Sequence, residues 1–467
     1  MTTAEHALDL VRDATRGTAY DGRLWLVGGW VRDKALGEPP RQDIDIVLES
    51  DAGDLAHVIC DAGIADHAPV TYPRFGTAMV TVAGQRIELV TARRESYDEW
   101  SRKPAAVEPA TLAEDASRRD FTINTLIENL HGGQIVDPLG LAYPDLNARI
   151  IRTPIDPEAT FRDDPLRMLR AVRFSARLGF EIEPATWRAI VASAERLAPP
   201  TVSAERIRDE FIKTLETSRP AEGVAMLAES GLLAQFAPEL LEMRGCEQNE
   251  FHSLPVWEHV LLALTNLVNA EPDASVNLRL AVLLHDIGKP RTRSVGGDGR
   301  VHFYGHEDVG ARMARTLLGR LKLPGADIEA VASLVAQHMR IGEYKPERWT
   351  DAAVRRFVRG AETHLDDLFA IHRADVRALS ASHQDLTRAR LLKERIELLE
   401  TTQPSRQIVS PLTGDEIMAL LGEPPGPRIG VVKDWLTGEV IEGRLTQGDK
   451  DGASALVRSG RWKVAVA

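Results

Sequence analysis

The stretch LVGGWVRDKALGEPPRQDIDIVLE, residues 26–49, decides the fold of the N-terminal part of the chain. One apolar run leads into Gly28 and Gly29, and a second apolar run carries Asp43 and Asp45. Buried strands rarely hold two carboxylates, because an unpaired charge away from water costs several kcal/mol. Residues i and i+2 of a strand point to one face, so the two side chains project together. The pair therefore indicates a magnesium site, since Mg²⁺ prefers oxygen ligands and often shares its shell with phosphates.

Other residues of this region fit a site for a metal and a phosphate. Glu88, in the strand-like run RIELVT, can add a third carboxylate from a neighbouring strand. At the Gly28-Gly29 turn, backbone N–H groups can approach a phosphate, and Arg32 follows in the first helical turn. A glycine pair alone is usually only a turn, and a D-x-D pair alone is usually a solvated edge. Their combination favours the metal–phosphate site.

Composition sets outer limits on function. The chain has 467 residues, a formal net charge of -12, 43% hydrophobic and 27% charged residues. Two cysteines, Cys60 and Cys246, can build neither a disulfide framework nor a structural zinc site. No apolar run approaches the roughly 18 residues that span a bilayer, so we expect a cytoplasmic protein without a membrane partner. Residues 161–180 are rich in arginine, so phosphate contacts remain possible locally despite the acidic total.

The pattern along the chain predicts an α/β head with a mixed β-sheet, followed by all-α parts. Short apolar strands alternate with helices over residues 1–155, and the pattern is helical from 156 onward. We expect four domains, with the following bounds: an α/β head at 1–155, a helical neck at 156–240, a histidine-rich helical domain at 241–400 and a helical tail at 401–467.

The motifs resemble a known family. LVGGWVRD followed by QDIDIVLE is similar to the head of the polymerase-β-like nucleotidyltransferases, specifically the bacterial class II tRNA CCA-adding and poly(A) polymerase family. RRDFTIN, DPLG, RDDPLRMLRAVRFSARLGF and SAERIRDEF follow in family order over about the first 215 residues. The order of modules and the tail PLTGDEIMALLG look closest to the actinobacterial group, and the tail resembles a segment that contacts the body of tRNA.

The resemblance implies a role for each motif of the head. Asp43 and Asp45 would hold two Mg²⁺ ions that stabilise the attacking and leaving oxygens of an in-line displacement. RRDFTIN would grip the ribose through Asp120 and Asn124, which share a face if the segment is helical. Arg118 and Arg119 would contact phosphate. The alternative for this motif is helix capping and ion pairing.

The segment DDPLRMLRAVRF would select the nucleotide. Asp164 and Arg167 are neighbours if both lie on one helix. A carboxylate accepts from the exocyclic amine of cytosine or adenine while a guanidinium donates to the ring nitrogen, which admits C and A and rejects G and U. Asp164-Pro165 is also an ordinary helix start. Further residues would neutralise phosphate, and these are Arg170, Arg173 and Arg177. Others would orient the side chains that read the base, and these are Glu205, Arg206 and Glu210; Arg206 and Glu210 also fit a simple i,i+4 ion pair.

The histidine-rich half resembles the HD-type metal-dependent phosphohydrolases. His285 and Asp286 are adjacent at an apolar helix end, as in the core of that pattern. Imidazole and carboxylate ligands suit Mn, Ni, Co, Fe or Zn better than Mg. The resemblance implies six ligands, which are His259, His285, Asp286, His306, His338 and Asp375.

Together, the residues and the resemblance predict a template-independent CTP/ATP:tRNA nucleotidyltransferase that adds all or part of CCA to tRNA. The expected partners are CTP, ATP and tRNA that lacks all or part of CCA, and no DNA partner is expected. Three alternatives stay open. They are a poly(A) polymerase or an enzyme adding only CC or only A, an HD phosphohydrolase whose head merely binds nucleotide, and an RNA-binding protein without chemistry.

Overall fold

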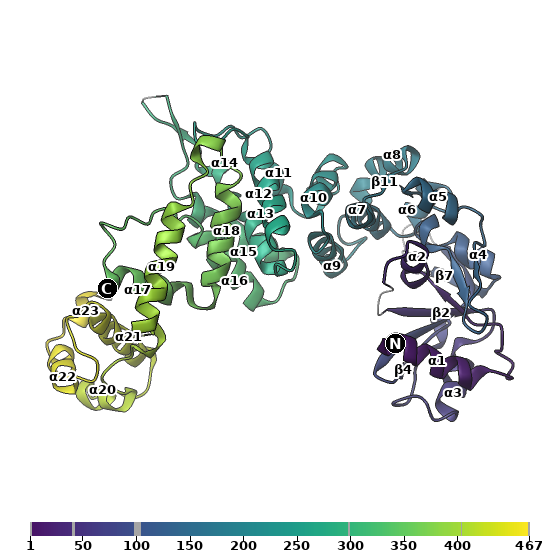
Figure 1. Cartoon of the computed structure of the whole chain (residues 1–467), viewed down its shortest axis with the longest axis horizontal. Coiled ribbons are helices and arrows are strands. Elements are labelled where there is room, and N and C mark those ends of the chain that lie inside the picture. The colour runs from purple at the N-terminus through teal and green to yellow at the C-terminus, as the bar shows by residue number, and fades with distance from the viewer. Residues whose placement is uncertain (1, 40–42, 98–103, 298, 403, 466–467) are drawn as a thin grey trace. The chain divides into compact units, whose positions relative to one another are not determined.

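The computed structural model describes residues 2–39, 43–97, 104–297, 299–402 and 404–465, and it divides into two units (Figure 1). Unit 1 comprises Met1–Leu241 with Arg320–Leu323, and unit 2 comprises Glu242–Gly319 with Pro324–Ala467. Of the described helices, none has the length and apolar character to cross a membrane.

Unit 1 begins with a mixed seven-stranded sheet in the order β3-β4-β5-β2-β1-β8-β9. Strands β2 and β5 pair in parallel and the other neighbours are antiparallel, as an α/β head with a mixed sheet requires. The strands are β1 (Trp25–Val27), β2 (Ile44–Leu48), β3 (Val70–Tyr72), β4 (Thr77–Val82), β5 (Gln85–Thr91), β8 (Ile127–Asn129) and β9 (Ile135–Val136). In a separate two-stranded sheet, β6 (Arg93–Tyr97) pairs antiparallel with β7 (Pro104–Pro109).

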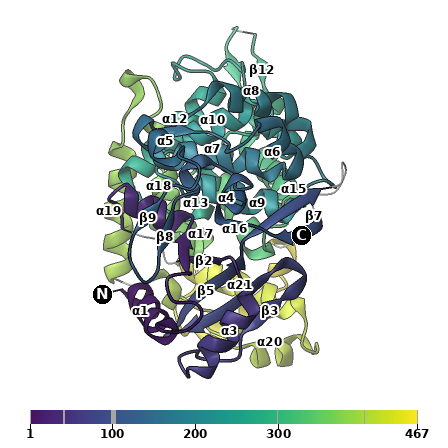
Figure 2. The same ribbon diagram turned by 90° about the vertical axis from the view of Figure 1, so that its right-hand side faces the viewer.

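Alternation in sequence explains how the sheet buries one face. In β4, Ala78, Val80 and Val82 are buried and their neighbours are less so. Helices α1 (Thr3–Thr15) and α3 (Ala52–Asp61) contact each other and both pack on β4 and β5 (Figure 2). Helix α1 starts with a capping box in which Thr2 and Glu5 satisfy each other's backbone N–H groups.

The rest of unit 1 is helical apart from the two-residue strands β10 (Ile150–Ile151) and β11 (Glu181–Ile182), which pair in parallel. Helix α7 (Leu166–Leu178) packs on α9 (Ala204–Leu215) and α10 (Pro220–Glu229), and Arg173 of α7 pairs with Glu210 of α9. The remaining elements are α2 (Gly29–Ala35), η1 (Pro73–Phe75), α4 (Leu112–Ser117), η2 (Thr122–Asn124), α5 (Ala142–Ala148), α6 (Pro157–Asp163), α8 (Pro184–Ser193), η3 (Ala194–Leu197), η4 (Leu233–Gln235) and α11 (Pro238–Leu241).

Unit 2 is built on four helices that pack on one another: α12 (Val256–Ala270), α13 (Val276–Leu284), α16 (Gly325–Gln337) and α18 (Leu365–Val376). Around them lie α14 (Lys289–Thr292), the β12–β13 hairpin (Ser294–Val295 and Val301–His302), α15 (His306–Arg320), α17 (Asp351–Ala361), η5 (Glu362–His364), η6 (Ala381–His383) and α19 (Thr387–Thr402). The hairpin is a small addition to a region expected to be all-α.

The last part of unit 2 has a hydrophobic cluster of its own. Leu412, Ile417, Val432, Leu436 and Trp462 are among its buried members. It is formed after η7 (Ser405–Gln407) by α20 (Gly414–Leu421), α21 (Pro427–Ile441), α22 (Lys450–Arg458) and α23 (Trp462–Ala465).

Candidate active sites

The sheet of unit 1 brings three carboxylates to adjacent positions. Asp43 directly precedes β2, Asp45 lies within it, and Asp45 is in register with Glu88 on the parallel strand β5. Burial raises the pKa of Asp45 to about 6. The negative charges of Glu88 and Asp43 also raise this pKa, and the positive charge of Arg119 lowers it. A half-buried carboxylate among other carboxylates is a site that a cation would stabilise.

Strand β1 carries the glycine turn to the same place. Val27 is in register with Asp45, and Gly28 follows with φ 77°, a conformation that favours glycine. A Cβ atom at Gly28 would lie 3.5 Å from Asp45 Oδ2, so the turn passes close over the carboxylate. Helix α2 then begins at Gly29.

A polar cavity of about 260 Å³ opens beside this turn. Its lining includes most of the nucleotide-binding residues expected from sequence, drawn from α2 and the glycine turn before it, the segment that ends in η2, and α7. The described residues that line it are Gly28, Gly29, Arg32, Asp43, Asp45, Arg119, Asp120, Asn124, Arg170, Arg173, Phe174, Arg177 and Lys213. Glu88, Arg118, Asp164 and Arg167 are not among them.

Sequence reasoning left Phe174 and Lys213 out of the expected site, and both line the cavity. Arg177 continues the spacing of Arg170 and Arg173 on α7 and lines the cavity with them. Lys213 lies on α9, and no local pattern distinguishes it from an ordinary surface lysine. Arg118 and Arg119 both pair with the buried Asp115, at 2.6 and 2.9 Å, and only Arg119 reaches the cavity.

One end of the cavity rests on a buried ionic network centred on Arg32, which is 1% exposed. Its guanidinium donates to Asp33 Oδ1 at 2.6 and 2.8 Å and to Asn124 Oδ1 at 2.7 Å. Arg177 donates to the other Asp33 oxygen at 2.8 Å. Asp33 therefore ties α2 to α7, and Arg32 holds Asn124 in place.

The network continues through Asp120 to α9. Asn124 Nδ2 donates to Asp120 Oδ1 at 2.9 Å, and Arg170 donates to Asp120 Oδ2 at 2.6 and 2.9 Å. Burial opposes ionisation of Asp120, but Arg170 and Asn124 outweigh it and hold its pKa below the usual range. The buried Glu210 accepts from Arg173 at 2.6 Å and lies 3.5 Å from Arg170. Asp120 and Glu210 thus fix the arginines of α7 beside the cavity.

The RRDFTIN segment does not form an α-helix. Helix α4 starts with a capping box of Thr111 and Glu114 and ends at Ser117. The extended backbone at Phe121 (φ -140°, ψ 149°) then separates Asp120 from the η2 turn. Asp120 and Asn124 therefore meet through a turn and not along a helix face. The hydrogen bond that closes η2 is local, so periodicity could not reveal it.

Asp164 and Arg167 do not share a helix. Asp164 has an extended backbone (φ -144°, ψ 100°) between α6 and α7, and its Oδ1 accepts from the N–H of Leu166, as in the helix-start alternative. Arg167 donates to the Arg118 carbonyl at 2.8 Å. The partner of Asp164 is Arg206, which donates to it at 2.8 and 3.3 Å.

The pairing of Arg206 with Asp164 also overturns the simple i,i+4 pair on α9. Glu210 faces Arg173, and Arg206 faces Asp164, so each joins α9 to another segment. Glu205 is exposed in the first turn of α9. This arrangement fits residues that orient other side chains.

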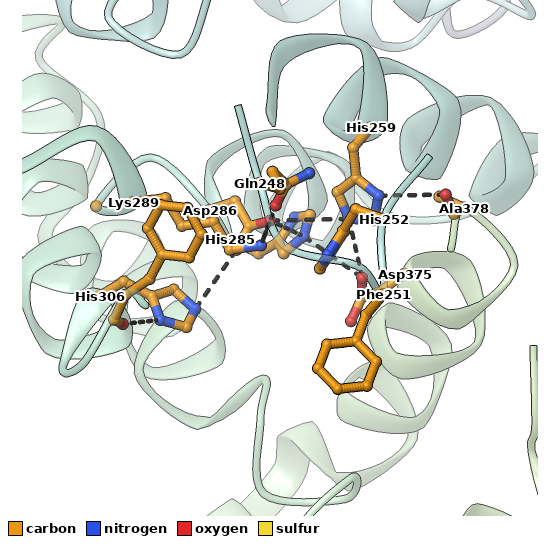
Figure 3. A network of polar contacts seen from close by, with 12 residues as sticks. Gln248, Phe251, His252, His259, His285, Asp286, Lys289, His306, Asp375 and Ala378 are labelled. Atoms are coloured by element: carbon orange, nitrogen blue, oxygen red, sulfur yellow. Dashed lines mark hydrogen bonds and ion pairs between the residues drawn. The ribbon is translucent and has the colours of Figure 1, made fainter. Parts of the chain in front are cut away.

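Unit 2 gathers all six expected metal ligands at helix ends (Figure 3). His259, His285 and Asp375 form one group and Asp286, His306 and His338 form another, and within each group the ligand atoms lie within 4.8 Å of one another. His259 Nε2 is 3.0 Å from Asp375 Oδ1, and His306 Nε2 is 3.3 Å from His338 Nε2.

Asp286 lies between the two groups. Its Oδ2 is 3.2 Å from His285 Nε2 and 3.7 Å from His259 Nε2, and its Oδ1 is 3.4 Å from His306 Nε2. The geometry has room for one carboxylate to serve both groups. Among the described residues, groups of three ligand atoms that all lie within 4.8 Å of one another occur in unit 2. A cation at the head carboxylates would complete its coordination shell with water or phosphate oxygens.

The chemistry of these residues fits a metal. His285 Nε2 is buried without a well-aligned hydrogen-bond partner among the described residues, and its Nδ1 faces the Val282 carbonyl at 2.7 Å. Burial, together with His285 and His306, lowers the pKa of His338 to about 3, so its imidazole is neutral and its Nε2 can ligate. The Val335 carbonyl at 2.7 Å from His338 Nδ1 orients the ring.

Comparison with known protein families identifies three segments of the chain. Three family models match: "Poly A polymerase head domain" at residues 24–152, "Probable RNA and SrmB-binding site of polymerase A" at 179–243, and "HD domain" at 252–395. The fold is a nucleotidyltransferase head followed by helical parts that include an HD domain.

Relatives of known activity place the chain more closely. It is 41% identical over 331 residues to an A-adding tRNA nucleotidyltransferase of Deinococcus radiodurans, covering 69% of this chain and 74% of that protein. It is 36% identical over 358 residues to a CC-adding tRNA nucleotidyltransferase of Thermus thermophilus, covering 75% and 78%. The structure of the Bacillus stearothermophilus CCA-adding enzyme in complex with CTP matches over the whole of both chains with a TM-score of 0.68 and 24% identity, which shows the common fold.

The chain belongs to the tRNA nucleotidyltransferase and poly(A) polymerase family. It is an enzyme with an HD domain behind its polymerase head. Closeness to the actinobacterial group stays a prediction.

Proposed function

We infer that this chain is a template-independent CTP/ATP:tRNA nucleotidyltransferase that adds all or part of CCA to the 3′ end of tRNA. The observation that carries the inference is the cavity in which Asp43 and Asp45 meet the glycine turn and the arginines of α7. Relatives named as A-adding and CC-adding enzymes keep the extent of addition open.

Asp43 and Asp45 are the residues that would hold Mg²⁺, with Glu88 as a nearby third carboxylate. Bound Mg²⁺ supplies charge that stabilises the attacking 3′-oxygen and the leaving pyrophosphate. The close backbone at Gly28 and Gly29 leaves space for the triphosphate, and Arg170 and Arg173 add positive charge. Asp120 and Asn124, already joined by a hydrogen bond, present polar atoms to the ribose.

Nucleotide selection would fall to Asp164 and Arg167, with Arg206 as a positioning residue. The two hydrogen bonds from Arg206 hold the Asp164 carboxylate in one orientation, so it can accept from the exocyclic amine of C or A. A carboxylate facing the oxygen of U or G would repel it, which excludes those bases. Arg118 contributes its carbonyl to the positioning of Arg167.

The HD domain is proposed to hydrolyse phosphate esters, such as cyclic 2′,3′-phosphates or phosphates at damaged RNA ends. The site would hold one or two ions of Mn, Ni, Co, Fe or Zn through His259, His285, Asp286, His306, His338 and Asp375.

We also propose a division of the chain into domains at residues 1–155, 156–240, 241–400 and 401–467. The tail would contact the body of the tRNA. The protein would lie in the cytoplasm and would have no membrane or DNA partner.

The test is incubation of the full chain with Mg²⁺, labelled CTP or ATP, and tRNAs that end before CCA, before the second C, or before A. Incorporation of both labels, in the order C, C, A, supports full CCA addition. Incorporation of one label only identifies a partial enzyme, and long A tracts identify a poly(A) polymerase. Phosphate release without incorporation would contradict the inference in favour of a hydrolase.

A further inference from the structure

A pocket of about 450 Å³ lies over the metal-ligand cluster of unit 2. Asp286, His306, His338 and Asp375 belong to its lining, so it leads from solvent to the candidate metal centre. This volume is in the range of sites that hold a small organic molecule, about 300–1,000 Å³. The pocket therefore has space for more than an isolated phosphate.

The pocket lining includes large apolar side chains that are exposed. Tyr304 is 78% exposed, Phe251 47% and Met339 41%, and they come from three different segments. Figure 3 shows the Phe251 ring beside Asp375. Exposed aromatic residues gathered at one pocket carry a cost in water, which a bound planar group would relieve.

Two of these rings are held in defined orientations. Tyr304 stacks on His302 with ring centroids 5.1 Å apart and planes inclined by 10°, and its hydroxyl is 3.3 Å from His302 Nδ1. Phe251 meets the His383 ring edge-on at 5.0 Å and 85°. Both histidines line the same pocket. We define these four residues as the aromatic rim.

The floor of the pocket has the opposite character. Lys289 Nζ lies 2.7 Å from Asp286 Oδ2 and donates to Gln248 Oε1 at 2.7 Å, which fixes a buried ammonium beside the ligand cluster. A cation and metal ligands at the floor suit a phosphate, whereas the rim suits a flat ring. A phosphate joined through a sugar to a planar base is a nucleotide.

We propose that the aromatic rim binds the base of a terminal ribonucleotide while its phosphate lies at the metal-ligand floor. The inference rests on the hydrolase function proposed above and names its substrate class, a single-stranded RNA end or a nucleoside phosphate derived from one. Stacking on Tyr304 or Phe251 requires no particular base, because every base has an aromatic face. The HD site thus accepts any of the four bases, unlike the C- and A-selective head.

The test compares two probes, uridine 3′-monophosphate and inorganic phosphate, by calorimetric titration of the Mn²⁺-loaded full chain. We choose uridine because the base selection proposed for the head excludes uracil. We expect the nucleotide to bind the wild-type protein more tightly than phosphate. Tyr304→Ala or Phe251→Ala should weaken nucleotide binding on the order of 5- to 100-fold while phosphate affinity stays within about twofold.

Matched variants separate stacking from disturbance of the fold. Tyr304→Phe keeps the ring and should retain nucleotide affinity. Leu398→Ala removes an exposed apolar side chain (67% exposed) from α19, outside the described pocket lining, and should change neither affinity. CCA addition by each variant checks that unit 1 is intact.

Equal affinity of the wild-type protein for the two probes would overturn the proposal, as would equal weakening of both in the alanine variants. Hydrolysis is measured separately with uridine 2′,3′-cyclic phosphate. If the protein does not hydrolyse this compound but still binds the nucleotide more tightly than phosphate, and this preference depends on the aromatic rim, the hydrolase function is wrong and the base-binding role of the rim stands.

Discussion

Asp45→Asn removes a carboxylate that is unfavourable in the metal-free protein. Burial raises the pKa of Asp45 from 3.8 to about 6, with added repulsion from Glu88 and Asp43. The same carboxylate is a proposed ligand of the catalytic metal. We therefore expect the substitution to raise the free energy of unfolding in metal-free buffer and to abolish nucleotide addition, a trade-off typical of active sites.

The magnitude follows from linkage between ionisation and folding. A pKa of about 6 in place of 3.8 corresponds to about 3 kcal/mol at neutral pH, since one pKa unit is about 1.4 kcal/mol. Because the folded-state pKa is the higher one, this group's stabilisation is fully present below about pH 4 and is lost as the pH rises through about 6. Asparagine does not ionise, so its advantage should be near zero at pH 4 and greatest above pH 6.

Urea unfolding of the wild-type and variant proteins in chelator, across this pH range, measures the difference. For a folding unit of this size, 3 kcal/mol corresponds to a rise in Tm of roughly 6–12 °C. Added Mg²⁺ should stabilise the wild-type protein and leave Asp45→Asn unchanged, because only the former retains the full ligand pair. Asp43→Asn is the matched control: its side chain is exposed, so it should lose activity without a comparable gain in stability.

The reasoning would be refuted if Asp45→Asn were equally or less stable than the wild-type protein at pH 7.5 in chelator. A gain of the same size at pH 4 and pH 7.5 would refute it equally, because a pH-independent gain cannot come from a raised pKa. Retained nucleotide addition would remove Asp45 from the catalytic site.

Three further predictions concern other parts of the two sites. Arg173 is 6% exposed and pairs with Glu210 at 2.6 Å, so Glu210→Ala leaves a buried guanidinium without this partner. The substitution should lower the free energy of unfolding by about 3–5 kcal/mol, and an unchanged midpoint of urea unfolding would contradict this. Arg206→Ala frees the Asp164 carboxylate, so the ratio of kcat/KM for CTP over UTP should fall about tenfold or more, and an unaltered ratio would exclude a positioning role. His285→Ala should lose bound metal, measured by elemental analysis, and any phosphodiesterase activity, while nucleotide addition persists; loss of addition in a folded variant would show that the two functions are coupled.

The fold of the head could be predicted because its signals are local. Alternation in TAMVTV and RIELVT identified strands that the structure places at β4 and β5, and the D-x-D spacing at Asp43 and Asp45 needed only the two-residue repeat of a strand. The six HD residues were expected from the resemblance to the HD family, and the structure brings them together at helix ends.

The partners within the cavity could not be predicted, because they depend on tertiary contacts. Asp33 and Arg177 are 144 positions apart, and no spacing rule joins them. Helical spacing favoured Asp164 with Arg167, but an extended backbone at Asp164 turned it toward Arg206 on α9. Charged side chains on arginine-rich helices have many possible partners, and only the packing of α7 on α9 selects among them.

The buried ionic network has a consequence for engineering chimeric enzymes. Since Asp33 and Asp120 each hold an arginine of α7, a segment containing α7 cannot be exchanged with a relative's segment by itself. A donor helix with a different charge pattern would strand these acids in the interior, so the recipient positions must be transplanted along with it. Natural divergence faces the same constraint, and substitutions at these sites should arise as compensated pairs.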